Sequence, residues 1–95
     1  MRSAAIEKWY ARQCNGEWEH SYGIKIDTLD NPGWTVQIDL SETRKQDSVL
    51  KRVEIERTKD DWIQYWVEKK QFRIVCGPLN LNEALDIFVS WFNSD

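Results

Sequence analysis

The sequence contains a single histidine and only two cysteines, and these scarcities exclude several kinds of site. Zinc sites take three or four converging histidine, cysteine or carboxylate ligands. One histidine and two distant cysteines, Cys14 and Cys76, therefore argue against a metal site, and we expect no cofactor. Thiols so far apart also do not form a disulfide framework, so both are expected to be reduced, as in a cytosolic protein.

Long apolar runs are also missing from the sequence. A membrane-spanning helix needs roughly 18 consecutive apolar residues, and no stretch comes near that length. The first residues, MRSAAIEKWYARQ, lack the apolar centre of a secretory signal. We therefore expect a cytoplasmic protein with no membrane partner.

Basic charge is in short supply as well. Thirteen Lys and Arg stand against 16 Asp and Glu, which gives a formal charge of −3, whereas nucleic-acid binders usually carry a basic stripe. We expect no nucleic-acid partner, and a basic protein partner fits better because complementary charge speeds encounter. The 95 residues, 41% hydrophobic and 31% charged, suit one domain over residues 1–95, and they leave the oligomeric state open.

Helical periodicity marks both ends of the chain. Residues 3–14 place apolar side chains on one stripe, with Ser3 available as N-cap, and the Asn-Gly pair that follows ends the helix. Near the other end, Asn80 can cap a helix, with Glu83 three residues on in a capping-box-like spacing. The buried stripe of this closing helix is predicted to be Leu81, Ala84, Leu85, Phe88, Trp91 and Phe92.

Between the helices the apolar residues recur with a period of two, as in half-buried strands. Pairing Thr28 with Trp34 across the loop LDNPG makes the apolar faces of the first two strands coincide, which predicts a hairpin. Pro32-Gly33 carries a type II turn signature in which Gly33 can take a positive φ. The five strands are expected at residues 24–28, 34–40, 53–57, 62–68 and 72–76.

These elements predict an α+β fold. We expect an antiparallel sheet of about five strands, arranged as a meander, with an N-terminal and a C-terminal helix packed on it. The helices are most simply placed on the face that carries Ile24, Val36 and Ile55.

The fourth strand can take two registers. Pairing with the third strand buries Ile63, Tyr65 and Val67, whereas pairing with the fifth strand through a three-residue loop buries Trp62 and Trp66. One β-bulge would reconcile the two registers. Either the tryptophans or the aliphatic set then lies on the face opposite the helices.

The stretch NGEWEHSYG brings the only histidine, His20, next to two glutamates and a tryptophan. No serine or cysteine lies at a recognisable nucleophile spacing, so the stretch is not interpreted as an active site. We expect Trp18 and Tyr22 to anchor the junction between helix and strand. Glu17, Glu19 and His20 would line its rim, where they can touch a partner.

Cys76 is the one candidate for catalysis. It ends a predicted strand before a Gly-Pro loop and a helix N-terminus, a position that can lower the pKa of a thiol. Sulfurtransferases and phosphatases follow their cysteine with several glycines or an arginine, and CGPLNLN has neither. A buried structural cysteine is the simpler interpretation, with a small thiol enzyme as the alternative.

The strand face away from the predicted helices offers a candidate binding surface. It carries several carboxylates, with the two strand tryptophans as possible anchors, and tryptophan is enriched in binding hot spots. For any single acid, simple solvation is the alternative. The candidate partner-binding residues are Trp18, Glu19, His20, Asp27, Asp39, Glu54, Glu56, Trp62 and Trp66.

Three stretches of the sequence resemble the immunity protein 53 family, small bacterial proteins that accompany polymorphic toxins and protect the producing cell or its kin. They are WYARQCNGEWEHSYGIKIDTLDNPGWTVQIDL (9–40), DWIQYWVE (61–68) and GPLNLNEALDIFVSW (77–91). The resemblance covers nearly the whole chain and implies a cytosolic, non-catalytic α+β protein that neutralises a cognate toxin domain by occlusion. A carboxylate-rich face would suit a basic nuclease, because the acids can stand where phosphates would.

Two further interpretations accompany this one. Members of the family have been labelled as sulfurtransferase-related, but Cys76 without a catalytic loop after it gives that activity little physical support. A housekeeping protein-binding adaptor without a toxin is the other.

Overall fold

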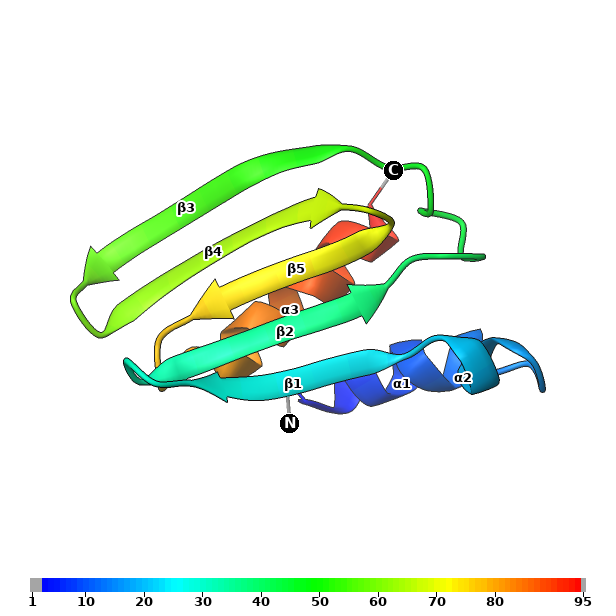
Figure 1. The fold of residues 1–95 in the computed structure, drawn as a ribbon, viewed down its shortest axis with the longest axis horizontal. Helices are drawn as coiled ribbons and strands as arrows, with labels where there is room; N and C mark the ends of the chain where they lie inside the picture. Colours follow the sequence, from blue (N-terminus) through cyan, green and yellow to red (C-terminus); the bar gives the residue numbers. More distant parts are fainter. Residues whose placement is uncertain (1–2, 95) are drawn as a thin grey trace.

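A computed structural model describes residues 3–94 of the chain, which form a five-stranded sheet with helices packed on it (Figure 1). The expected α+β class, with a helix at each end of an antiparallel sheet, is confirmed. One helical turn between the first helix and the sheet was not predicted. The elements in chain order are α1 (Ser3–Gln13), α2 (Trp18–Ser21), β1 (Ile24–Leu29), β2 (Gly33–Asp39), β3 (Leu50–Thr58), β4 (Asp61–Glu68), β5 (Gln71–Cys76) and α3 (Leu81–Asn93).

The strand order is β1-β2-β5-β4-β3, with every neighbouring pair antiparallel. This order is not a meander, because β2 pairs with β5 and the loop over residues 40–49 carries the chain across to β3 at the far edge (Figure 1). Burial accounts for the difference: β5 buries every second residue, whereas β3, LKRVEIERT, has five charged residues in nine. A charged strand suits an edge and an apolar one suits the centre.

The hairpin of β1 and β2 has the expected register. Thr28 lies opposite Trp34, and Ile26 lies opposite Val36. The positive φ expected of Gly33 is wrong, because among the described glycines only Gly16 has one. Glycine is needed at position 33 for space instead, since a Cβ there would lie 2.4 Å from the carbonyl oxygen of Cys76 on β5.

The ambiguity of β4 is resolved by a loop shorter than expected. Lys69 and Lys70 alone connect β4 to β5, with φ values of 52° and 59°, as in a type I′ turn. This two-residue loop lets the registers to β3 and to β5 agree, and it places Ile63 and Val67 on the helix side. The strand tryptophans therefore lie on the opposite side of the sheet.

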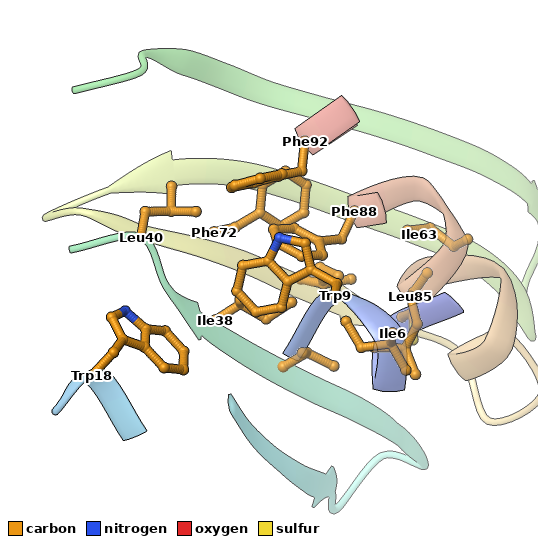
Figure 2. Close-up of a cluster of buried hydrophobic side chains, with 14 residues drawn as sticks. Ile6, Trp9, Trp18, Ile38, Leu40, Ile63, Phe72, Leu85, Phe88 and Phe92 are labelled. Atoms are coloured by element: carbon orange, nitrogen blue, oxygen red, sulfur yellow. The ribbon is translucent and has the colours of Figure 1, made fainter. Parts of the chain in front are cut away.

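Trp9 of α1 lies at the centre of the core, with no exposed surface (Figure 2). Its ring meets those of Phe88 and Phe92 of α3 edge to face, with centroids 4.8 and 5.3 Å apart. Such ring pairs contribute about 0.5–1.5 kcal/mol each beyond the area they bury. The sheet residues Val36 and Ile38 join the same cluster, which confirms that both helices pack on one face of the sheet.

The start of α3 differs from the predicted capping box. Asn80 occupies the N-cap position, but its side chain makes no capping hydrogen bond. Its Oδ1 accepts from the backbone N–H of Trp62 at 3.3 Å, and its Nδ2 donates to Asp61 at 2.9 Å. Glu83 accepts from Arg57 at 2.6 Å instead of closing the box. The polar groups expected to cap the helix therefore tie it to the ends of β3 and β4.

Two further expectations concern the helices. The expected N-cap role of Ser3 depends on its side chain, which lies outside the part of the chain that the structure describes. Among residues 3–94, no helix has both the length and the apolar character needed to cross a membrane.

Candidate functional site

The side of the sheet opposite α1 and α3 has no helix over it among residues 3–94, and we call it the open face (Figure 1). Strand registers decide which side chains lie on it, because neighbouring residues of a strand point to opposite sides. All four carboxylates and both strand tryptophans predicted for this surface do lie on it. The open face is formed by Lys25, Asp27, Thr35, Gln37, Asp39, Arg52, Glu54, Glu56, Trp62, Gln64, Trp66, Glu68, Gln71, Arg73 and Val75.

The carboxylates of the open face do not gather in one cluster. A single row across the sheet runs Asp27, Thr35, Val75, Gln64, Glu54. The two acids at its ends are four strand spacings apart, roughly 19 Å. The crossover to β3 causes this separation, since a meander would have put β3 next to β2.

Asp39 is engaged within the sheet. Its Oδ2 accepts from the backbone N–H of Gly23, and its Oδ1 accepts from Nε2 of Gln71, both at 2.9 Å. The carboxylate thus ties the chain entering β1 to β2 and β5. Both of its oxygens already serve the fold, so it is a poorer contact residue than the sequence suggested.

The other half of the open face holds an ordered polar network. Nε and Nη2 of Arg52 donate to Oε1 of Gln64 at 3.0 and 2.5 Å, and Nε2 of Gln64 donates to Glu56 at 2.8 Å. The Arg52 guanidinium also lies 4.2 Å from the centroid of the Trp66 ring. We call this area the β3–β4 patch, formed by Arg52, Glu54, Glu56, Trp62, Gln64 and Trp66.

The two tryptophans of the β3–β4 patch differ in what they can still bind. Trp66 is covered on one face by the Arg52 guanidinium, and its indole N–H donates to Glu68 at 2.9 Å. Trp62 lies directly opposite Glu56 and lines a shallow hollow of about 280 Å³ together with Lys59. Within residues 3–94 its indole N–H has no hydrogen-bond partner, so Trp62 can offer a partner both a ring and a donor.

Helix α2 lies beyond the start of β1, next to α1 (Figure 1). Trp18 is 3% exposed, and its indole N–H donates to the carbonyl of Ser41 at 2.9 Å. It anchors the junction, as expected, and this burial leaves almost none of its surface for a partner.

Glu19 and His20 lie in the same helical turn but differ in whether the side chain is engaged within the fold. The Glu19 carboxylate accepts from the backbone N–H groups of Asn15 and Gly16 at 2.9 and 2.8 Å. Backbone hydrogen bonds, from its own N–H first and then from these two, lower the pKa of the Glu19 carboxyl. His20 is exposed at the surface.

Cys76 lies inside the sheet with no exposed surface, opposite Trp34 on one side and Ile63 on the other. Burial raises the pKa of its thiol to about 11, the reverse of what a nucleophilic cysteine needs. Among the described residues no group of three or more His, Cys, Asp or Glu side chains could hold a metal ion. The buried thiol of Cys76 therefore does not have the environment of a nucleophilic cysteine.

Several polar residues of the open face, Arg52, Gln64 and Arg73 among them, were not predicted from the sequence. Gln64 lies between Trp62 and Trp66 in β4, and Arg73 lies between Phe72 and Ile74 in β5. The alternation of side chains along a strand could therefore have assigned both residues to the open face. Arg52 could not have been placed, because the register of β3 is irregular between Leu50 and Val53. With these residues the open face is mixed in charge rather than purely acidic.

Comparison with known proteins agrees with the resemblance seen in the sequence. A family model described as immunity protein 53 matches residues 3–93, which include every helix and strand of the structure. No curated protein and no solved structure gives a significant match.

Proposed function

The chain belongs to the immunity protein 53 family, and we therefore propose that it binds a cognate toxin domain and neutralises it by occlusion. The toxin would be part of a bacterial polymorphic toxin system, and the complex would form in the cytoplasm of the cell that makes it. The proposed contact surface is the open face, centred on the β3–β4 patch.

The observation that carries this proposal is the position of Trp62 beside Glu54 and Glu56 on a sheet face that no described helix covers. Tryptophan supplies a large apolar contact and one donor, and charged residues around such an anchor form the rim typical of protein interfaces.

The hydrogen bonds within the β3–β4 patch favour binding further. Gln64 joins Arg52 to Glu56, so these side chains are held before a partner arrives. Pre-ordered side chains lose less conformational entropy on association, which leaves more of the contact energy for affinity.

Electrostatics favour a toxin with a basic surface. Glu54 and Glu56 are exposed near one edge of the sheet, and the whole chain carries a formal charge of −3. Such charges speed the encounter with a basic partner. They would suit a nuclease, because the two carboxylates could bind the basic groups that otherwise bind the phosphates of its substrate.

The remaining predicted contacts would lie at the margin of this interface. Asp27 is at the β1 edge, and Glu19 and His20 would be reached only by a toxin that extends past the end of β1. Trp18 and Asp39 are left out of the proposed contact because their side chains serve the fold.

Protection of cells that express the toxin domain of the neighbouring reading frame tests this proposal against the thiol-enzyme alternative. Trp62→Ala should abolish protection, whereas Cys76→Ala, checked for folding by circular dichroism, should retain it. The opposite pattern would favour an enzyme centred on Cys76. If the neighbouring frame encodes no toxin domain, the housekeeping adaptor would be the better account.

A further inference from the structure

The two edges of the sheet differ in how they are protected against pairing with another strand. β3 carries five charged residues in nine, and its register to β4 is irregular at two places. Charges and bulges of this kind prevent edge-to-edge association. β1 pairs with β2 regularly over all six residues, with no bulge and no proline, so its outer edge is a regular template.

An apolar groove runs beside this unprotected edge. It lies between α1 and β1, has a volume of about 470 Å³, and is lined by Ile6, Tyr10, Ile24 and Ile26 among others. Ile26 and Tyr10 are 42% and 39% exposed, which leaves apolar surface in contact with water beside free backbone groups. Within residues 3–94 nothing covers this surface.

The register shows which backbone groups of β1 are free. The N–H of Asp39 donates to the carbonyl of Gly23 at 3.0 Å, so these residues form a hydrogen-bonded pair. Such pairs alternate along an antiparallel ladder. The backbone groups of Lys25 and Asp27 therefore point towards β2, and those of Ile24, Ile26 and Thr28 point outward.

We propose that β1 pairs antiparallel with β1 of a second copy of this chain, about a twofold axis at Ile26. Ile26 then faces Ile26 of the second copy, and Ile24 faces Thr28, each pair sharing outward backbone groups. On the open face, Lys25 lies directly opposite Asp27 of the second copy, and the symmetry repeats this ion pair. The strand is thus complementary to itself in charge and in hydrogen bonding.

Charge selects this register over its neighbours. A shift that keeps the hydrogen bonds would place Lys25 opposite Lys25, or Asp27 opposite Asp27, and like charges directly opposite each other are destabilising. A shift by an odd number of residues would place the outward N–H and C=O groups of one copy opposite residues of the other copy whose backbone groups are already bonded to β2. Within residues 3–94 neither Lys25 nor Asp27 has an ion-pair partner, so both charges are available.

The resulting dimer has one continuous ten-stranded sheet with the helices of both copies on the same side. α1 of each copy lies beside the interface, so the exposed Ile26 and Tyr10 side chains of the two grooves cover each other. One strand pair and one helix contact form a small interface, and we expect a dissociation constant on the order of micromolar. The β3–β4 patches of both copies remain free, so this inference goes beyond the proposed toxin binding and does not depend on it.

Charge exchange tests the proposed dimer, with sedimentation velocity as the measurement. Lys25→Asp leaves two acids on each strand, and Asp27→Lys leaves two bases, so each variant alone should dimerise at least about tenfold more weakly than the wild type. An equimolar mixture of the two variants restores an opposite charge at every pair and should recover the dimer. Lys51→Asp on the β3 edge, a matched control, should leave the wild-type dimerisation unchanged.

Ile26→Pro provides a second, independent variant. It removes an outward N–H without touching the ladder to β2, and it should give a folded monomer. The proposal is overturned if the wild type stays monomeric at concentrations on the order of 100 µM, or if the mixed variants dimerise no better than either alone.

Discussion

The six tryptophans of this chain divide between the interior and the open face. Trp9 and Trp18 are buried, Trp91 packs against Phe72 of the core, and the indole of Trp34 donates to the carbonyl of Pro78 at 3.0 Å. Trp62 and Trp66 lie on the open face. At the scale of single residues, this division separates side chains that hold the fold from side chains that lie on the candidate binding surface.

Two acids of the open face differ in the same way: Asp39 is hydrogen-bonded within the sheet, whereas Asp27 is exposed. Asp39→Ala leaves the N–H of Gly23 and the amide of Gln71 without an acceptor, and we expect it to cost about 1–3 kcal/mol of unfolding free energy. Asp27→Ala, on the same face and exposed, should change stability by less than about 0.5 kcal/mol. Urea denaturation at a concentration low enough for monomers measures both, and equal losses would show that the two hydrogen bonds contribute little.

The thiols should differ in reactivity for the same reason. Cys76 is fully buried with a pKa of about 11, so at pH 7 to 9 it stays protonated and covered, whereas Cys14 is partly exposed. Iodoacetamide should therefore modify Cys14 in the native protein and Cys76 only after unfolding, as peptide mass spectrometry can show. Modification of native Cys76 at pH 7 as fast as Cys14 would contradict this and would revive the thiol-enzyme alternative.

At the scale of elements, the turns decide how the strands pair. The loop LDNPG and the alternation of apolar residues leave one register for β1 and β2, so that hairpin could be predicted from sequence. The turn of Lys69 and Lys70 could not, because both residues take a positive φ, which usually calls for asparagine or glycine. No turn residue of the usual kind therefore indicated that the two registers of β4 agree.

The turn at Lys70 permits a direct comparison of two variants. Lys70→Gly and Lys70→Ala both lose the 3.0 Å ion pair with Asp47, so they differ only in how well they accept the φ of 59°. The glycine variant should be more stable than the alanine variant by about 1 kcal/mol in urea denaturation. An alanine variant of equal or greater stability would argue against a left-handed conformation at this position.

At the scale of the whole molecule, the strand order determines the candidate site. The alternation of residues along each strand placed the acids and tryptophans on one face correctly, since that depends only on local geometry. Their distances depend on which strands are neighbours, and neighbours in sequence are the usual expectation for antiparallel strands. The crossover from β2 to β3 through a polar loop without a motif moved Glu54 and Glu56 to the edge opposite Asp27.

The same arrangement gives the molecule two separate surfaces. The β3–β4 patch presents Trp62 with two exposed acids, and the β1 edge presents regular backbone groups beside an apolar groove. Three to four strand spacings separate them, so a toxin on the patch and a second copy at the edge need not compete.

The affinity for the proposed cognate toxin domain, measured by titration calorimetry, tests the central claim most directly. Glu54→Lys with Glu56→Lys should weaken binding by about 10- to 100-fold, because both acids lie in the proposed interface. Asp30→Lys with Glu42→Lys makes the same change in net charge at exposed positions off the open face, and it should stay within about threefold of the wild type. Equal affinities for the two double variants would contradict binding through the open face.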